Sequence, residues 1–498
     1  MSSHSPILDA IFRHAAEIPA KPAVVDGNVV VTYSGLADGI RRAASALSGL
    51  GVRRGDRVAI SAQKGTGYVF FYFASQFIGA VNVVVDAQSS EGRLRFVEAK
   101  TRPVVCLGYS SPDVRSFGFD EIDFSAAPAA DASASADASP DDVAEILFTT
   151  GTTGEPKGVC LSHANIFASA SNINSFIGNT ADDVEVLALP ICHSFGLGRL
   201  RCCLVKGATI VLLGSFANLP LFFRALERHQ ATGFGMVPAA WAYIRKVSGS
   251  RIAKFAPQIR YIEIGSAAMP RERKEELAKM FPDTRICHHY GLTEASRAAF
   301  MEYHADATDL NTIGREVCAE VSIRVFDEGG RPQPDGTPGE ICVRGNMVMK
   351  GYLDRGRTDV DFFGEYFRTG DIGWRSPDGR LYLAGRKKEL INVGGRKASP
   401  SEIEDAAISL GVEDCICAAA PDPEGILGEV PKLYILRNGT SLSFDELKSR
   451  LSGVLEPYKV PVMYEWIDEI PKTASGKKQR LQLSGRMGGG DVVRVQKP

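Results

Sequence analysis

Residues 146–159 combine a short apolar run with threonines, glycines and a lysine that could bind an anion. Ile146, Leu147 and Phe148 suit a buried strand, and the composition then changes within a few residues. Glycines let backbone N–H groups approach phosphate oxygens, hydroxyl groups add donors, and a lysine adds positive charge. The candidate phosphate ligands are Thr149, Thr150, Gly151, Thr152, Thr153, Gly154 and Lys157. The sequence therefore predicts a phosphate-binding loop that directly follows a strand.

The spacing of this segment differs from the phosphate loop of the common NTPases. That loop places its lysine between a glycine and a serine or threonine. Here Pro156 precedes Lys157 and Gly158 follows it. By composition alone, the segment is equally consistent with an ordinary surface turn. The choice between these two interpretations depends on other motifs in the chain.

Five further stretches contain residues suited to binding a nucleotide or a carboxylic acid. They are residues 189–196, 290–294, 366–371, 385–404 and 471–477. With the threonine- and glycine-rich loop, they resemble the ordered motifs of the adenylate-forming enzymes, the superfamily of acyl-CoA synthetases, adenylation domains and beetle luciferases. The resemblance covers nearly the whole chain. It implies activation of a carboxylic acid by Mg·ATP to an acyl adenylate with release of pyrophosphate, followed by transfer of the acyl group to a thiol.

The pattern of elements predicts an α/β fold. Strands that alternate with helices favour a parallel sheet, and residues 321–382, rich in strand and turn signals, favour a small antiparallel barrel or sheet. We predict a large N-terminal adenylation domain, residues 1–387, that binds ATP and the acid and consists of α/β subdomains plus a small β-barrel. Residues 388–498 are predicted to form a small α+β C-terminal domain. The resemblance implies that this domain is mobile and carries the catalytic lysine.

Several residues are candidates for holding the nucleotide and its metal. Tyr290 could stack on adenine while the carboxylate of Glu294 holds Mg²⁺ against the triphosphate. Asp371 could accept hydrogen bonds from both ribose hydroxyls. The resemblance implies that Arg386 assists at the ribose or phosphate. Taken singly, Tyr290 is more often a core residue, Glu294 a solvated acid and Asp371 a turn residue. The resemblance adds Gly265, Ser266, Ala267, Gly291 and Thr293 to the nucleotide site.

Lys477 is the predicted catalytic lysine. It follows a Thr-Ala-Ser-Gly turn, from which an ammonium group could reach into a neighbouring site. The resemblance implies that this lysine bridges the substrate carboxylate and the α-phosphate. One charge at about 4 Å contributes roughly 4 kcal/mol at an effective dielectric constant of 20. We expect the adjacent Lys478 to be solvated. The resemblance further implies that the small domain rotates about Lys388, the hinge.

His193, Phe195, Gly265 and Leu292 are the predicted residues of the acyl pocket. The resemblance assigns His193 a catalytic position beside the acyl group, although a lone histidine is more often structural. Because residues 190–213 contain no acid that could pair with a substrate ammonium, an α-amino acid is disfavoured. The apolar residues favour a medium-chain, aromatic or small branched acid.

Arg199 and Arg201 allow a different substrate hypothesis, in which one of them pairs with a second carboxylate on a dicarboxylic acid. Residues two apart on a helix do not share a face, so we expect at least one of these arginines to point outward or to form a salt bridge.

Gly394 and Gly395 correspond by resemblance to the tunnel for the pantetheine thiol, although a Gly-Gly pair would serve a hairpin turn equally well. The predicted acceptor is CoA, and the alternative is the phosphopantetheine of an acyl carrier protein. A nucleotide-binding regulator without catalytic activity is a more remote alternative. The presence of Lys477, Glu294 and Asp371 argues against it.

Composition excludes other classes of protein. A net charge of −2 over 498 residues argues against binding to nucleic acid or to anionic membranes. The ten cysteines have spacings that suit neither zinc nor a disulfide framework, which predicts a cytoplasmic protein.

The apolar residues 68–85 are predicted to form a buried helix and strand, broken at Gly79, rather than a membrane span. His288 and His289 should point to opposite faces of an extended segment, so we expect no metal site there.

Overall fold

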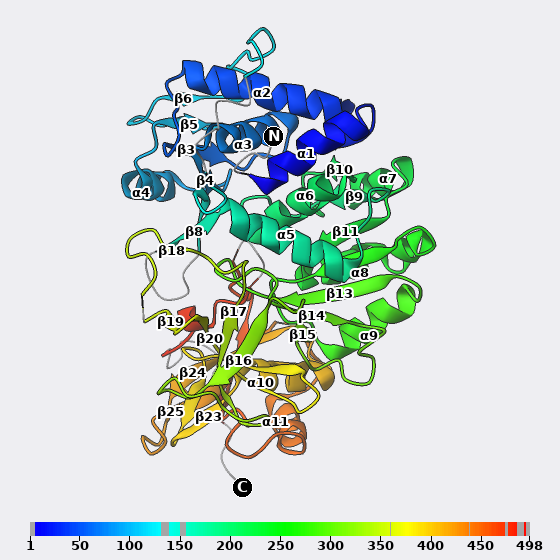
Figure 1. Ribbon diagram of the computed structural model, residues 1–498. Coiled ribbons are helices and arrows are strands. Elements are labelled where there is room, and N and C mark those ends of the chain that lie inside the picture. The colour runs from blue at the N-terminus through cyan, green and yellow to red at the C-terminus, as the bar shows by residue number, and fades with distance from the viewer. Residues whose placement is uncertain are drawn as a thin grey trace.

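The computed structural model describes residues 5–130, 139–149, 156–358, 360–437, 439–473, 477–485 and 493–494. Figure 1 shows the N-terminal part as layers of helix and sheet, with the last part of the chain gathered at the opposite end of the molecule. Within the described ranges, no helix has the length and apolar character needed to cross a membrane.

The first sheet has seven strands in the order β18-β8-β7-β4-β3-β5-β6. The strands from β7 to β6 run parallel, and β8 and β18 are antiparallel additions. Their bounds are β3 (Arg57–Ser61), β4 (Val81–Val85), β5 (Val105–Leu107), β6 (Ser116–Phe117), β7 (Val143–Phe148), β8 (Gly158–Ser162) and β18 (Gly351–Tyr352). The predicted strand before the phosphate loop is therefore β7.

The second sheet has nine strands in the order β15-β14-β13-β12-β11-β9-β10-β1-β2. Its six central strands, from β13 to β1, are parallel. The bounds are β1 (Pro22–Asp26), β2 (Val29–Thr32), β9 (Val184–Leu187), β10 (Thr209–Leu212), β11 (Gly233–Met236), β12 (Tyr261–Ile264), β13 (Arg285–Tyr290), β14 (Ala299–Glu302) and β15 (Arg315–Glu316).

Helices cover both sheets. They are α1 (Pro6–Glu17), α2 (Tyr33–Gly49), α3 (Thr66–Ile78), α4 (Glu91–Thr101), α5 (His163–Ile177), α6 (Ser194–Lys206), α7 (Leu219–Arg228), α8 (Pro238–Ser248), the 3-10 helix η2 (Arg251–Phe255) and α9 (Arg271–Met280). The predicted break at Gly79 is confirmed, because α3 ends there and Gly79 adopts a φ of +83°. Helix α5 begins with a capping box formed by Ser162 and Asn165. Helices α5 and α6 pack against each other between the two sheets, with α5 crossing the front of the molecule (Figure 1).

An antiparallel subdomain follows, as the turn-rich sequence predicts. It contains β16 (Ser322–Phe326), β17 (Gly339–Arg344), β19 (Phe362–Phe363), β20 (Tyr366–Arg375) and β21 (Leu381–Arg386). The alternation of buried with partly buried or exposed residues in β16 and β20 is typical of a sheet with one face on a core.

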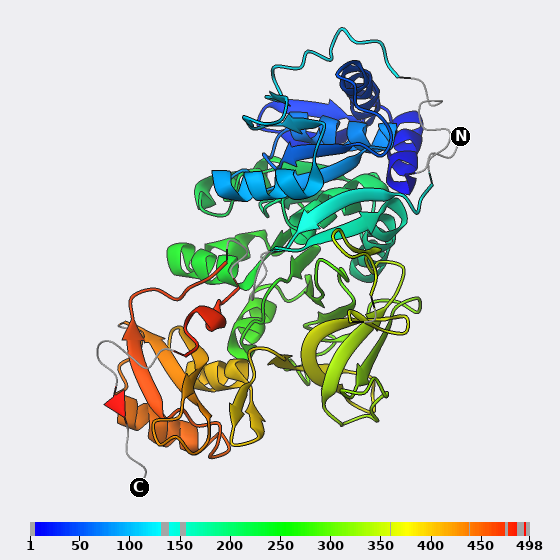
Figure 2. The ribbon, with the colours of Figure 1, turned by 90° about the vertical axis from the view of Figure 1, so that its left-hand side faces the viewer.

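The last part of the chain forms a C-terminal unit, residues 391–485, with its own hydrophobic core. Its elements are β22 (Ile391–Val393), β23 (Arg396–Ala398), α10 (Pro400–Ser409), β24 (Cys415–Pro421), β25 (Glu429–Leu436), α11 (Phe444–Ser452), β26 (Met463–Ile467), η3 (Arg480–Gln482) and, beyond residue 485, β27 (Val493–Arg494). In Figure 2, this orange and red unit lies beside the antiparallel subdomain, and a red stretch reaches up to the green part of the large unit. A large α/β part with a separate C-terminal domain confirms the predicted fold class, and the boundary between residues 387 and 388 stays a prediction.

The carboxyl ends of the parallel strands carry most of the predicted site residues. Strand β7 leads into the phosphate loop, β12 into Gly265, and β13 into the segment after Tyr290. Strands β4 and β9 lead to Asp86 and to residues 188–193. In open α/β sheets, ligands bind outside these ends. The fold therefore gathers motifs that are far apart in sequence at one edge of each sheet.

Candidate active site

The phosphate loop is the connection of a β-hairpin. Phe148 of β7 pairs with Gly158 of β8, and the backbone N–H of Thr149 donates to the carbonyl of Lys157 at 3.0 Å. The two ends of the loop are therefore held together. Thr150, Gly151, Thr152, Thr153 and Gly154 lie outside the described residues.

Tyr352 brings together the lysine of the loop and the predicted metal ligand. Its hydroxyl donates to Glu294 Oε1 at 2.9 Å, and Lys157 Nζ lies 4.7 Å from the centre of its ring. Glu294 is only 8% exposed, and a nearly buried carboxylate next to a lysine suits a site for Mg²⁺ and triphosphate. The structure therefore places two predicted ligands from different motifs around one ring.

A second cluster joins the predicted adenine and ribose residues. Tyr290, at the end of β13, donates from its hydroxyl to Asp371 Oδ2 at 2.6 Å. Arg386 Nε lies 2.7 Å from Asp371 Oδ1, because Asp371 on β20 and Arg386 on β21 are cross-strand partners. Burial raises the pKa of Asp371, although the charge of Arg386 and the hydrogen bond from Tyr290 act in the opposite direction. A carboxylate has about four lone-pair sites, so two remain for ribose hydroxyls.

We expect the Asp371→Asn variant to raise the KM for ATP by about 10- to 100-fold, because hydrogen bonds to a charged group contribute about 1.5–3 kcal/mol. The amide also removes the ionic partner of Arg386. ATP titration of pyrophosphate exchange measures the change. Asp378→Asn is the matched control, since Asp378 is a 49%-exposed carboxylate on the same hairpin that pairs with Arg380. A normal KM for ATP in the Asp371 variant would exclude the ribose role.

The segment after β12 has little space for side chains. A Cβ at Gly265 would lie 1.9 Å from Cε1 of His289, so only glycine fits there. Ser266 follows with a φ of +72°, and the carbonyl of Ala267 accepts a hydrogen bond from His288 Nε2 at 3.1 Å. Gly291 is similarly confined, because its Cβ would lie 2.4 Å from the backbone nitrogen of Arg297. Thr293 and Leu292 are half-buried in the loop that leads to Glu294.

Lys477 belongs to the C-terminal unit but its charge acts within this cluster. Lys477 is exposed as a whole residue, but enough protein lies near its ammonium group to desolvate it in part. This burial lowers the pKa of Lys477, and the charge of Arg386 lowers it further, whereas Asp371, Glu294 and Glu389 raise it. The backbone of Thr473 donates to the carbonyl of Lys477 at 2.8 Å, and Lys477 donates back to the Thr473 hydroxyl at 3.1 Å. These bonds close the turn that presents the side chain.

Lys478 was expected to be solvated, and this expectation is wrong. Its Nζ lies 3.0 Å from Glu404 Oε2 and 3.1 Å from Asp414 Oδ1. Arg480 also contacts Glu404, at 2.8 Å. Lys478 therefore anchors the lysine turn to the C-terminal unit, and Lys477 is the neighbour directed to the site.

His193 immediately precedes α6 and lies in a polar cluster that was not predicted from the sequence. Ligand atoms of Asp86, Cys192 and His193 lie within 4.8 Å of one another, and His193 Nε2 is buried with no hydrogen-bond partner among the described residues. Burial lowers the pKa of His193, with Asp86 raising it and Lys477 lowering it. Burial also raises the pKa of the Cys192 thiol to about 12. In sequence, the only sign of this cluster is that Asp86 follows a buried parallel strand.

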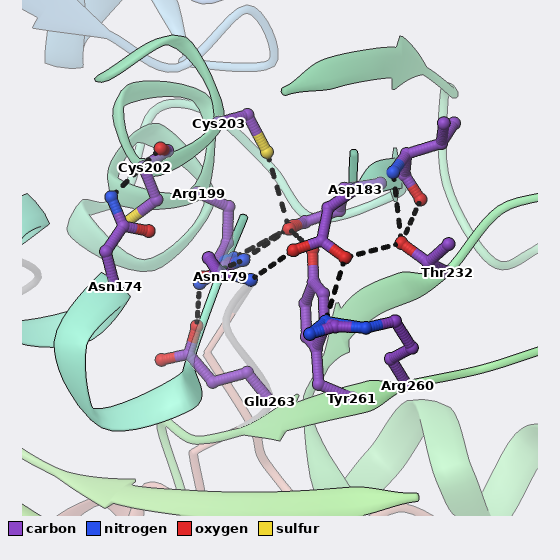
Figure 3. Close-up of polar contacts among 12 residues, drawn as sticks. Asn174, Asn179, Asp183, Arg199, Cys202, Cys203, Thr232, Arg260, Tyr261 and Glu263 are labelled. Atoms are coloured by element: carbon purple, nitrogen blue, oxygen red, sulfur yellow. Dashed lines mark hydrogen bonds and ion pairs between the residues drawn. The ribbon is translucent and has the colours of Figure 1, made fainter. Parts of the chain in front are cut away.

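The dicarboxylate hypothesis is contradicted, because both arginines are buried in ion pairs. Arg199 is fully buried, its Nε lies 2.9 Å from Glu185 Oε1, and its Nη1 lies 3.2 Å from Glu263 Oε2 (Figure 3). Arg201 Nη2 lies 3.0 Å from Glu145 Oε1. The carboxylate partners come from distant strands, which helical spacing in α6 alone could not reveal. Neither arginine is available for a substrate.

Arg297 is a further residue that sequence reasoning missed. Its guanidinium donates to the carbonyls of Ser194 and Phe195, both at 2.9 Å, and to Glu263 Oε1 at 3.0 Å. It also lies 4.9 Å from the centre of the Phe195 ring. Arg297 therefore fixes the start of α6, which carries the predicted pocket residue Phe195 and directly follows His193. Its position just after the Tyr-Gly-Leu-Thr-Glu motif was the available signal.

The predicted hinge and thiol residues occupy turns. Lys388 is exposed in the turn between β21 and β22. Gly394 and Gly395 have φ values of +56° and +88° and form the two-residue turn between Val393 and Arg396. Such a hairpin turn requires φ > 0 at both positions, which accounts for both glycines. The hinge and tunnel roles stay predictions.

Comparison with known families assigns the chain. Residues 11–353 match the family described as AMP-binding enzyme. The chain belongs to this family. Residues 402–477 match the AMP-binding enzyme C-terminal domain, so both parts of the adenylate-forming architecture are present. The predicted superfamily is confirmed, and this AMP-binding enzyme is an acid–thiol ligase.

Relatives and solved structures agree with this assignment. 4-Coumarate–CoA ligase 1 of Petroselinum crispum is 28% identical over 98% of this chain and 95% of its own length. o-Succinylbenzoate CoA synthetase of Bacillus subtilis, in complex with its acyl-adenylate intermediate, aligns with a TM-score of 0.86 at 26% identity over 98% of this AMP-binding enzyme and 100% of that chain. ATP-bound MatB from Rhodopseudomonas palustris aligns with a TM-score of 0.85 at 25% identity over 96% and 98% of the two chains.

Proposed function

We propose that this AMP-binding enzyme activates a carboxylic acid with ATP and transfers the acyl group to CoA. In the first step, a carboxylate oxygen of the acid bonds to the α-phosphorus of ATP, and the bond from that phosphorus to pyrophosphate breaks. In the second step, the CoA sulfur loses its proton and bonds to the acyl carbon, and AMP leaves. The observation that carries this proposal is the position of Lys477, whose charge acts on Asp371, Glu294 and His193.

We assign roles to the residues as follows. Thr149 and Lys157 bind phosphate oxygens, Tyr290 faces adenine, and Asp371 with Arg386 holds the ribose. Glu294 would hold Mg²⁺, which offsets the charge of the triphosphate when bound. Relatives support the choice of metal, since the B. subtilis o-succinylbenzoate CoA synthetase has also been solved with ATP and a magnesium ion.

Lys477 would stabilise the negative charge that gathers when the carboxylate approaches the α-phosphate, because a fixed ammonium group in a desolvated site needs no reorganisation during the reaction. His193, whose buried Nε2 has no hydrogen-bond partner in the part of the chain that the structure describes, lies where it could contact the carboxylate or the first acyl carbons. The neutral state that burial favours for this imidazole avoids a second cation beside Lys477.

The acceptor thiol distinguishes two forms of the proposal. We expect acid-dependent AMP release with free CoA, because curated relatives over the full length are CoA ligases. The measurement compares AMP release with CoA and with a phosphopantetheine-bearing acyl carrier protein at equal thiol concentration. If AMP were released with the carrier protein but not with CoA, the carrier protein would be the acceptor, and the adenylation step of the proposal would still hold.

We also propose a cytoplasmic location and a C-terminal unit that turns about Lys388 between the two steps. All ten cysteines are free thiols, which supports a reducing compartment. The exposed turn at Lys388 connects two separately packed units, which is where hinges are commonly found.

A further inference from the structure

A buried glutamate–histidine pair borders the predicted acyl pocket and has no role in the steps above. Glu263 Oε1 lies 2.7 Å from His289 Nδ1, and the two side chains are 0% and 7% exposed. The residues come from adjacent parallel strands, β12 and β13. His288, the neighbour of His289, bonds instead to Tyr303 and Ala267, so the two histidines do face opposite sides.

The His289 ring forms part of the wall of the predicted pocket. A Cβ built on Gly265 would lie 1.9 Å from Cε1 and 2.1 Å from Nε2, so this edge of the ring faces Gly265. The Phe195 ring packs edge-on against His289, with the ring centres 4.6 Å apart. The charge of Lys477 acts on both His193 and His289. His289 therefore lies between two predicted pocket residues and close to the predicted site of activation.

The partners of Glu263 decide which nitrogen of His289 carries the proton. Glu263 lies 3.0 Å from Arg297 Nε and 3.2 Å from Arg199 Nη1. Although burial acts in the opposite direction, the charges of these arginines hold the pKa of Glu263 well below its usual range. An ionised carboxylate oxygen 2.7 Å from Nδ1 would repel a lone pair there, so we assign the proton of the neutral ring to Nδ1. In a neutral imidazole, Nε2 then carries the lone pair.

His289 is neutral in this setting. Burial lowers the pKa of His289, and the positive charges of Arg297 and Lys477 lower it further, while Glu263 acts in the opposite direction. No side chain or backbone group of the described residues forms a hydrogen bond with Nε2. Within the part of the wall formed by Phe195, Gly265 and His289, Nε2 of His289 is therefore the hydrogen-bond acceptor, separate from the buried Nε2 of His193.

We propose that His289 Nε2 accepts a hydrogen bond from a hydroxyl group on the acyl chain, so that the enzyme prefers a hydroxylated carboxylic acid to its unsubstituted counterpart. This inference rests on the proposed function. A second carboxylate on the substrate would be repelled by the lone pair of Nε2. A substrate ammonium group would be repelled by the positive charges of Arg297, Arg199 and Lys477. A neutral hydroxyl donor avoids both repulsions. Glu263 acts as a positioning residue that fixes the tautomer of His289.

Matched pairs of acids test the proposal in pyrophosphate exchange. We would compare 4-hydroxycinnamate with cinnamate and 8-hydroxyoctanoate with octanoate, so that chain shape and hydroxyl content vary separately. We expect kcat/KM to favour the hydroxylated member of at least one pair by tenfold or more, because a site built to bond a hydroxyl discriminates against its absence. In the His289→Leu variant, the ratio of kcat/KM for the hydroxylated acid to that for the unsubstituted acid should fall to about one. The change should come mainly from a lower kcat/KM with the hydroxylated acid.

Two further variants separate recognition from a structural role. His289→Gln retains an acceptor oxygen and should keep part of the preference. His288→Gln is the matched control, and its ratio should equal that of the parent. Equal use of both acids by the parent, or an equal loss with both in His289→Leu and His289→Gln, would overturn the inference while leaving the proposed function in place. Absence of exchange with every acid would instead overturn the proposed function, and this inference with it.

Discussion

The Lys477→Ala variant is expected to lose about 10³-fold in the rate of acyl-adenylate formation. The charges of Asp371, Glu294 and Arg386 act on the ammonium group, and these residues are where the nucleotide and the acid are predicted to meet. One charge at about 4 Å from a reacting anion contributes roughly 4 kcal/mol at an effective dielectric constant of 20, and each 1.36 kcal/mol is about tenfold in rate. Acid-dependent exchange of labelled pyrophosphate into ATP measures the first step directly.

The second step provides the internal control. Thioester formation from supplied acyl adenylate should fall far less, by about tenfold at most, because the two anions no longer need to be brought together. Lys254→Ala controls for the loss of a lysine, since Lys254 is 57% exposed and only 3.7 Å from Glu227 at the surface. Unchanged exchange in the Lys477 variant would remove the central residue of the proposed mechanism.

The arrangement of motifs was largely predictable from the sequence. The strand before the phosphate loop, the helix and strand separated at Gly79 and the antiparallel region after residue 321 are local patterns, and local patterns fix local structure. The gathering of the motifs follows from parallel strands, whose carboxyl ends share one edge. The type of reaction was predicted from the resemblance of the ordered motifs to those of the adenylate-forming enzymes.

The buried charges were not predictable in the same way. The pairs of Arg199 with Glu185 and of Arg201 with Glu145 join residues 14 and 56 positions apart. The ion pair of Lys478 was not predictable for the same reason, because its partner Glu404 is 74 positions away. A charged residue is usually exposed, and only tertiary contacts reveal an exception. His288 and His289 point to opposite faces, as the extended segment predicts, but the pairing of His289 with Glu263 required the strand register.

Arg199→Met should destabilise the protein by about 3–5 kcal/mol, which is the usual cost of removing one partner from a buried ion pair. Without Arg199, the hydrogen bonds that the Glu185 carboxylate keeps within the described part of the chain come from the hydroxyl of Tyr261, at 2.7 Å, and the thiol of Cys203, at 3.5 Å. A buried carboxylate with these partners must take up a proton or attract water. Denaturant unfolding followed by tryptophan fluorescence measures the loss.

The matched control is Arg260→Met, because Arg260 is 47% exposed and pairs with Asp183 at 3.2 Å (Figure 3), so that variant should cost less than about 1 kcal/mol. The double variant Arg199→Met with Glu185→Gln should recover much of the stability, since it removes the isolated charge. Turnover of mono- and dicarboxylic acids should keep the parent's ratio in every variant that folds. Parent-like stability of Arg199→Met with selective loss of dicarboxylate turnover would contradict this account. The arginine would then act on the substrate, and the buried pairs would not be what holds α6 against β9 and β12.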